Sequence, residues 1–195
     1  MNLNAVSKAE NLRLYILEHT LIIEESISEA LGSILNIEWE KSISFGHGSS
    51  SLSFNQKVQI IQDLKGIDKD RIQKLTDLMV IRNKFAHVKS IETFENLFEI
   101  SSGKNVKKNL DKYYSDQIDE LDVKDEETKY KAFFFLLFFD IIVFLSFLIG
   151  GQKREQRREK EDLEILLKLK VEVIKTKYGK KLLSKILTET NKSKP

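Results

Sequence analysis

The stretch RIQKLTDLMVIRNKFAHV, residues 71–88, decides the fold class. When these residues are placed on a helical wheel at about 100° each, the apolar side chains gather on one face. That face consists of Ile72, Leu75, Leu78, Met79, Phe85 and Ala86. The 195-residue chain has eight glycines and a single proline, Pro195, so it lacks the turn residues of a many-stranded β protein. The sequence therefore predicts an all-α fold.

A polar cluster lies beside this apolar face. Arg82 falls in the middle of the face, and Asn83 and His87 share its flank. A guanidinium group in an apolar stripe is costly unless it meets a carboxylate, carbonyl groups or an anion. The cluster therefore predicts either an internal salt bridge or a binding site. The carboxylates considered as internal partners are Glu24, Glu25 and Asp140.

Upstream of this stretch the sequence predicts two more helices. Residues 5–35 repeat apolar side chains at helical spacing and are expected to form one long helix, with Trp39 packed against its end. A Ser- and Gly-rich loop follows at residues 42–53. Ser53 and Gln56 then have the spacing of a capping box, which predicts the start of a short helix.

Two residues predict the junction between that short helix and the one that contains the opening stretch. Gly66 is expected to end the short helix, and Asp68 is expected to cap the next. Downstream, residues 92–100 are predicted to form a short helical turn. Residues 101–128 are polar and acidic, and we expect a loop there with at most one weak helix.

The segment AFFFLLFFDIIVFLSFLI, residues 132–149, contains only two polar residues, Asp140 and Ser146. Its length is near that of a transmembrane helix, and the basic run QKREQRR follows it. A carboxylate at its centre is costly inside a bilayer. We therefore favour the central helix of a bundle, surrounded by its neighbours, with Asp140 bound to a Lys, an Arg or a backbone donor. A membrane-anchored protein is the alternative.

The charge is unevenly distributed along the chain. Residues 152–195 carry 14 Lys and Arg against 7 Asp and Glu, whereas residues 1–151 carry 18 against 23. We expect a helical bundle at 1–150 and a basic C-terminal helix and tail at 151–195, with the helix reaching from Lys153 to about Leu187. Such a basic segment suits packing against a partner helix or contact with an anionic partner such as RNA.

The composition also excludes several kinds of site. The chain has no cysteine, which excludes disulfides and thiolate metal sites. Its three histidines, His19, His47 and His87, lack the spacing of zinc ligands, so no metal and no cofactor are expected. The acidic run at residues 119–127 is expected to be a solvated loop. Because the N-terminus shows no basic region followed by an apolar run, we expect no signal peptide and a cytoplasmic protein.

The segment LMVIRNKFAH, residues 78–87, carries an R-x4-H pattern with Asn directly after Arg. This pattern resembles that of the HEPN superfamily. The wider region at residues 51–98 is similar to the mannitol-repressor-like branch, in which a Ser-Phe-x-x-Lys helix start leads to I-R-N-x-F-A-H. The resemblance covers residues 50–98 in motif and roughly 5–150 in layout.

The resemblance implies an antiparallel helical bundle that works as a homodimer. It also implies a metal-independent endoribonuclease used in a toxin–antitoxin system or in phage defence, with a cognate antitoxin or regulatory protein as a further partner. In that role His87 would be the general acid and base, Arg82 would bind the scissile phosphate of RNA, and Asn83 would orient His87 or a phosphate oxygen. Lys89 departs from some nuclease members, which have tyrosine there. The alternative is a non-catalytic regulator in which the cluster ties helices together.

Overall fold

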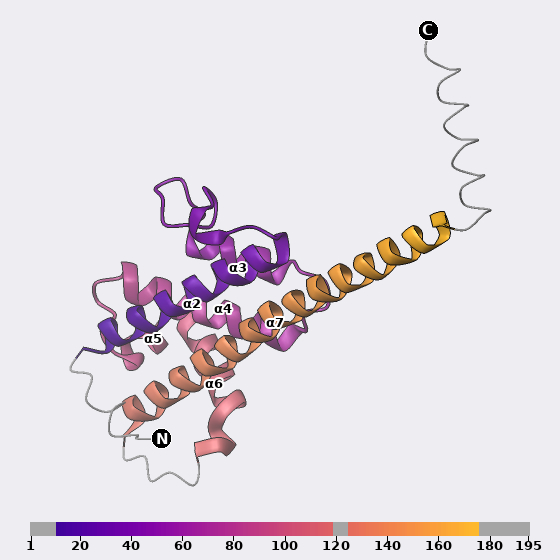
Figure 1. The fold of residues 1–195 in the computed structure, drawn as a ribbon. Helices are drawn as coiled ribbons and strands as arrows, with labels where there is room; N and C mark the ends of the chain where they lie inside the picture. The colour runs from indigo at the N-terminus through magenta and orange to yellow at the C-terminus, as the bar shows by residue number, and fades with distance from the viewer. Residues whose placement is uncertain (1–10, 119–124, 176–195) are drawn as a thin grey trace. The chain divides into compact units, whose positions relative to one another are not determined.

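The computed structural model of this protein describes residues 11–118 and 125–175, and this part of the chain contains helices and loops without a strand. The predicted all-α class is therefore confirmed (Figure 1). The elements in chain order are α2 (Leu12–Leu35), η1 (Trp39–Lys41), α3 (Phe54–Gln62), α4 (Lys69–His87), α5 (Phe94–Glu99), α6 (Ser101–Ile118) and α7 (Glu126–Lys175). Residues 5–10 of the predicted first helix and the expected helix end near Leu187 lie outside the described residues.

Local capping explains where the helices begin. The capping box of Ser53 and Gln56 is confirmed at the start of α3, and the Asp68 side chain caps α4 by accepting a hydrogen bond from Arg71 N at 2.9 Å. The predicted role of Gly66 is wrong, because α3 already ends at Gln62. Gly66 instead has φ of 86° in the turn before α4, a conformation that suits glycine.

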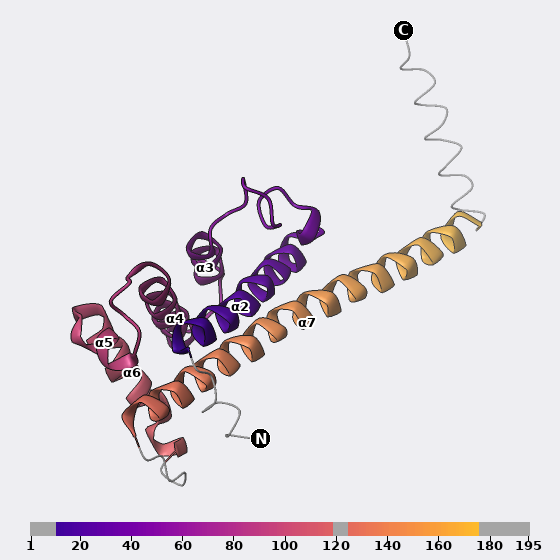
Figure 2. The same cartoon turned by 90° about the vertical axis from the view of Figure 1, so that its left-hand side faces the viewer.

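Long-range contacts give the direction of each helix in the bundle. Arg13 near the start of α2 contacts Val88 just after α4, so these two helices run antiparallel. Tyr15 and His19 of α2 contact Phe134 and Phe138 of α7 in the same order, so α2 and α7 run parallel and lie side by side in both views (Figures 1 and 2).

Helix α6 also runs parallel to α7. Asp111 accepts hydrogen bonds from Lys129 and Tyr130. The Tyr114 ring contacts the Phe133 ring at 5.8 Å between centroids, about one helical turn further along both helices.

Arg71 and Lys74 of α4 contact Phe144 and Asp140 of α7 in reverse order, so α4 runs antiparallel to α7 as well as to α2. The expected antiparallel arrangement therefore holds for α4, whereas α2, α6 and α7 run parallel to one another. The paired side chains fix α7 in the direction shared by α2 and α6.

The apolar segment of α7 supplies much of the core, but it is not surrounded as predicted. Phe133, Phe134 and Leu137 are fully buried, whereas Phe139 and Phe147 are 53% and 67% exposed. Helices α2, α4, α5 and α6 contact α7, but the exposure of Phe139 and Phe147 shows that they leave one side of it uncovered. Among the described residues, the stretch Glu126–Arg154 is long and apolar enough to cross a membrane, and one third of its most apolar part is buried in the bundle.

The expected loop at residues 101–128 is largely wrong, because residues 101–118 form α6. Val106, Leu110 and Tyr114 recur four residues apart and are all buried, which gives this polar segment an apolar stripe facing the core. Three side chains are enough to hold a helix whose other faces are solvated. Tertiary burial here overrides the polar composition.

Helix α7 continues through Gly150 and Gly151 without a break. The chain divides at this point into two compact units, with the boundary between Ile149 and Gly150. The first unit contains the bundle and all of the polar clusters considered below.

Candidate active site

The last turns of α4 present Arg82, Asn83 and His87 at the surface of the bundle. Ile81 and Phe85 of the same helix are completely buried and hold its position. Arg82 and Asn83 are half-buried, and His87 is exposed. Arg82, expected in the middle of the apolar face, is only half-buried, whereas its neighbour Ile81 is completely buried.

The structure brings the three predicted site residues into contact. Arg82 Nη1 donates a hydrogen bond to Asn83 Oδ1 at 3.1 Å and lies 3.4 Å from His87 Nε2. A guanidinium group can only donate, so His87 Nε2 can accept from Arg82 only while that nitrogen carries no proton. A neutral imidazole with an accepting nitrogen at the surface can take up a proton.

Helix α3 contributes two residues to the cluster. Asn83 Nδ2 donates to Asn55 Oδ1 at 3.1 Å, and the Arg82 guanidinium lies 5.4 Å from the centre of the Phe54 ring. Phe54 is buried, so it offers a fixed aromatic surface beside the cation. The start of α3 therefore orients both Arg82 and Asn83.

A second arginine fixes the chain directly after His87. Arg13 Nη2 of α2 lies within 3.0 Å of the carbonyl oxygens of Val88, Lys89 and Ile91. These contacts hold the segment that leaves α4 against the start of α2. The last turn of α4, which carries His87, is thereby anchored from outside the helix.

The predicted carboxylate partners of Arg82 are wrong. Glu24 pairs with Lys57 at 3.4 Å and Asp140 pairs with Lys74 at 2.8 Å. Within the described residues, Arg82 makes no ion pair with Glu24, Glu25 or Asp140. The Arg82 charge is therefore not neutralised by these side chains, and its remaining N–H groups can bind an anion such as a phosphate.

The other two histidines lie away from this cluster. His19 contacts the Tyr15 carbonyl at 2.8 Å and the Phe138 ring at 4.9 Å, while exposed His47 contacts the Trp39 ring. The described part of the chain contains no group of three or more His, Asp or Glu side chains placed to bind a metal ion. The acidic residues 119–124 lie outside the described residues.

Sequence reasoning missed Asn55, Phe54 and Arg13 as parts of the site. Asn55 and Phe54 belong to the Ser-Phe-x-x-Lys helix start, SFNQK at residues 53–57, and this was their only signal. Arg13 had none, because its three carbonyl acceptors lie 75 or more residues away along the chain. In comparisons with known proteins, no family model, no curated protein and no solved structure matches this chain.

Proposed function

We propose that this protein is a metal-independent endoribonuclease of HEPN type that acts in a toxin–antitoxin system or in phage defence. The observation that carries the proposal is the 3.4 Å contact between Arg82 Nη1 and His87 Nε2 at the exposed end of α4. A cation that binds phosphate and an imidazole that exchanges protons near neutral pH are the two groups that such a reaction requires.

RNA supplies its own nucleophile, so the protein needs no serine or cysteine. His87 Nε2 accepts the proton of a ribose 2′-OH while the 2′ oxygen forms a bond to the adjacent phosphorus. The bond from phosphorus to the 5′ oxygen breaks, and that oxygen takes the proton that His87 has accepted, so His87 acts first as base and then as acid. Arg82 donates hydrogen bonds to the phosphate oxygens as their charge increases, and Asn83 holds Arg82 in place. The products are a 2′,3′-cyclic phosphate and a 5′-hydroxyl.

The proposal includes two assemblies. A homodimer would bring two Arg82–His87 clusters to one RNA strand, and a cognate antitoxin or regulatory protein would restrain the activity in the cell. The excess of basic residues at 152–195 supports RNA as the substrate, because Lys and Arg side chains bind the phosphate backbone. Light scattering of the purified chain tests the dimer, with an expected mass of twice 22.7 kDa.

The decisive experiment compares RNA cleavage by the wild type, His87→Ala and Lys89→Ala in the presence of EDTA. Lys89 is exposed and two residues from His87, so it controls for a change of surface near the cluster. We expect the wild type and Lys89→Ala to produce fragments with 2′,3′-cyclic phosphate ends and His87→Ala to be at least 100-fold slower, the usual range for loss of a general base. Equal cleavage by His87→Ala and the wild type would remove the enzyme proposal.

A specific observation also favours a second function, a non-catalytic regulatory module similar to the mannitol repressor. The contacts of Asn83 with Asn55 and of Arg82 with Phe54 tie α4 to α3, as a purely structural cluster would. In that case Arg82→Ala lowers the melting temperature markedly and the purified wild type leaves RNA intact.

A further inference from the structure

A concave site lies in the same unit, between α2, the loop at residues 42–53 and the start of α3. Its volume is about 250 Å³. This is less than the roughly 300–1,000 Å³ of pockets for drug-sized ligands, so it suits a single ring system. Six side chains of its lining bear on what the cavity can bind: Glu24, Glu25, Trp39, His47, Ser51 and Lys57.

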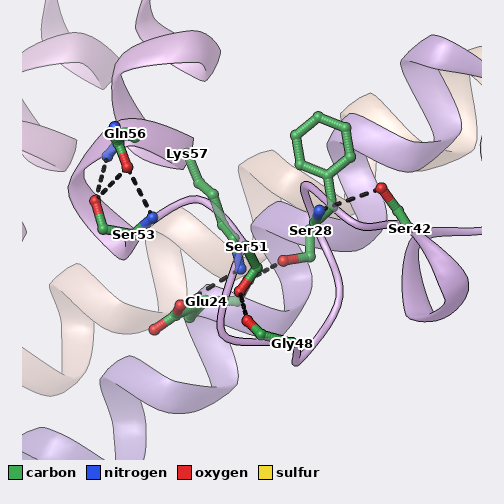
Figure 3. Close-up of polar contacts among 9 residues, drawn as sticks. Glu24, Ser28, Ser42, Gly48, Ser51, Ser53, Gln56 and Lys57 are labelled. Atoms are coloured by element: carbon green, nitrogen blue, oxygen red, sulfur yellow. Dashed lines mark hydrogen bonds and ion pairs between the residues drawn. The ribbon is translucent and has the colours of Figure 1, made fainter.

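Lys57 is the unusual member of this lining. Its side chain is 4% exposed, and its one hydrogen bond to a described residue is a long contact of 3.4 Å with Glu24 Oε1 (Figure 3). An ammonium group carries three N–H donors, and buried charges are costly when their donors are unused. Lys57 therefore has donors left for a hydrogen-bond acceptor in the cavity.

Glu25 gives the cavity a free acceptor. It lines the cavity one residue after Glu24, its side chain is exposed, and it forms no hydrogen bond or ion pair with a described residue. With Glu24 already paired to Lys57, Glu25 is the carboxylate available to accept N–H groups of a ligand. The site thus offers one cationic donor and one anionic acceptor.

Aromatic rings complete the lining. Trp39 and His47 both line the cavity, and their rings contact each other edge to face at 5.5 Å. Trp39 is fixed against α2, because a Cβ atom added to Gly32 would lie 2.8 Å from the Trp39 Cβ. A planar ligand can stack on a ring held in this way.

The loop that forms one wall is ordered by its own hydrogen bonds. The Ser42 hydroxyl accepts from the backbone N–H of Phe45 at 3.2 Å, and Ser51 donates to the Gly48 carbonyl at 2.6 Å (Figure 3). Phe45 is buried, and a side chain at Gly46 would clash with the Ser42 carbonyl at 2.7 Å. The wall is therefore shaped before a ligand binds, which lowers the cost of binding.

We infer that this cavity binds a guanine base. Guanine presents O6 and N7 as acceptors, which match the Lys57 ammonium, and N1–H and N2–H₂ as donors, which match the Glu25 carboxylate. Adenine carries an amino donor in place of O6, so it would set a donor against Lys57. A bare phosphate fits less well, because two carboxylates line the cavity against one buried lysine.

The start of α3 connects this cavity with the Arg82 cluster. Phe54 and Asn55 contact the cluster, and Lys57, within the same helical turn, contacts Glu24. The guanine can come from a free nucleotide or from an RNA strand. Its use as a specificity pocket beside a scissile phosphate rests on the proposed function, whereas base binding itself does not.

Trp39 is the only tryptophan in the chain, so its fluorescence reports on the cavity directly. The full chain is titrated with GMP and AMP, which share one phosphate, and with uncleavable 2′-O-methyl oligonucleotides that contain G or A. We expect saturable quenching by GMP and binding of AMP at least tenfold weaker. If the G-containing oligonucleotide binds more tightly than GMP, RNA is the source of the base. If the two bind equally, the free nucleotide is the source. Indistinguishable GMP and AMP, or quenching that does not saturate, overturns the inference.

Two substitutions at exposed positions of α2 provide a matched pair. Glu25→Gln should weaken GMP binding at least tenfold, while Glu18→Gln, outside the cavity lining, should leave it unchanged. Lys57→Met should abolish GMP binding. If this variant does not fold, the comparison of Glu25→Gln with Glu18→Gln tests the inference. Unchanged GMP binding by Glu25→Gln overturns the inference.

The His87→Ala variant separates the two proposals, because it should retain GMP binding while losing RNA cleavage. If the wild type binds GMP but does not cut RNA, only the proposed function is removed.

Discussion

The carboxyl group of Asp77 lies inside the bundle with 2% of the residue exposed. Asn109 donates to both of its oxygens at 3.1 Å, and Tyr113 and Gln73 donate at 3.3 Å. Burial raises the pKa of Asp77 above 3.8, and the three donors offset only part of this increase. The group is a structural carboxyl that joins α4 to α6.

The raised pKa of Asp77 predicts the direction of a pH effect. Above about 3.8 the unfolded chain loses this proton, whereas the folded chain retains it up to its higher pKa. The contribution of Asp77 to the free energy of unfolding therefore decreases as pH rises through this window. Relative to Asp77→Asn, the wild type should lose stability from about pH 3.8 upward, as measured by urea denaturation at a series of pH values. A difference in stability between the wild type and Asp77→Asn that does not change with pH would contradict this account.

Asp140 is predicted to stabilise the packing of α7 by satisfying a buried hydroxyl. It accepts from Lys74 Nζ at 2.8 Å and from the Tyr114 hydroxyl at 2.9 Å, and Tyr114 is 1% exposed. Asp140→Ala leaves that hydroxyl without its acceptor and should lower the free energy of unfolding by about 1–3 kcal/mol. The same substitution in a Tyr114→Phe background should cost less, because no hydroxyl is left unpaired. Equal costs in both backgrounds would show that the contact with Tyr114 is not the cause.

Gly150 and Gly151 are predicted to lower the stability of α7, and no close contact requires glycine at either position. A Cβ atom added to Gly150 or Gly151 would meet no atom within 4 Å. Replacing both with alanine should stabilise the helix by about 1 kcal/mol per residue and slow amide hydrogen exchange around this position. Gly103→Ala is the contrasting variant, because its Cβ would lie 1.7 Å from the Leu97 carbonyl oxygen and should destabilise the protein. Faster exchange in the double alanine variant would contradict this view of α7.

Some features of the fold could be predicted from residues that are neighbours in the sequence, and others could not. The N-caps Ser53 and Asp68 were predicted correctly because a cap depends on residues three positions apart. Helix α6 was missed because its burial depends on distant partners, as in the contact of Tyr114 with Asp140. The same division applies to the site. Arg82, Asn83 and His87 lie on one helix and were found by their spacing, whereas Arg13 reaches the site only through the fold.

For the whole molecule, the apolar part of α7 belongs both to the core and to the surface. Six of its large side chains are buried in the bundle: Phe133, Phe134, Leu137, Ile141, Phe144 and Leu145. Burial of each contributes about 1.5–3 kcal/mol. In a bilayer these side chains would stay out of water, but the faces of α2, α4 and α6 that pack on them would lose their cover, at a cost comparable to the stability of a typical domain, about 5–15 kcal/mol. We therefore infer that α7 stays in the bundle.

The protein should therefore be recovered without detergent. After cell lysis and centrifugation we expect it in the supernatant, even though Phe139, Val143 and Phe147 form an exposed apolar stripe on α7. Replacing these three with serine leaves the six buried side chains in place and should not change the fractionation or the melting temperature by more than a few degrees. If the wild type instead stays in the membrane pellet after carbonate washing and the serine variant does not, the stripe binds lipid. If both stay in the pellet, α7 is inserted, and the bundle cannot be the state of the protein in the cell.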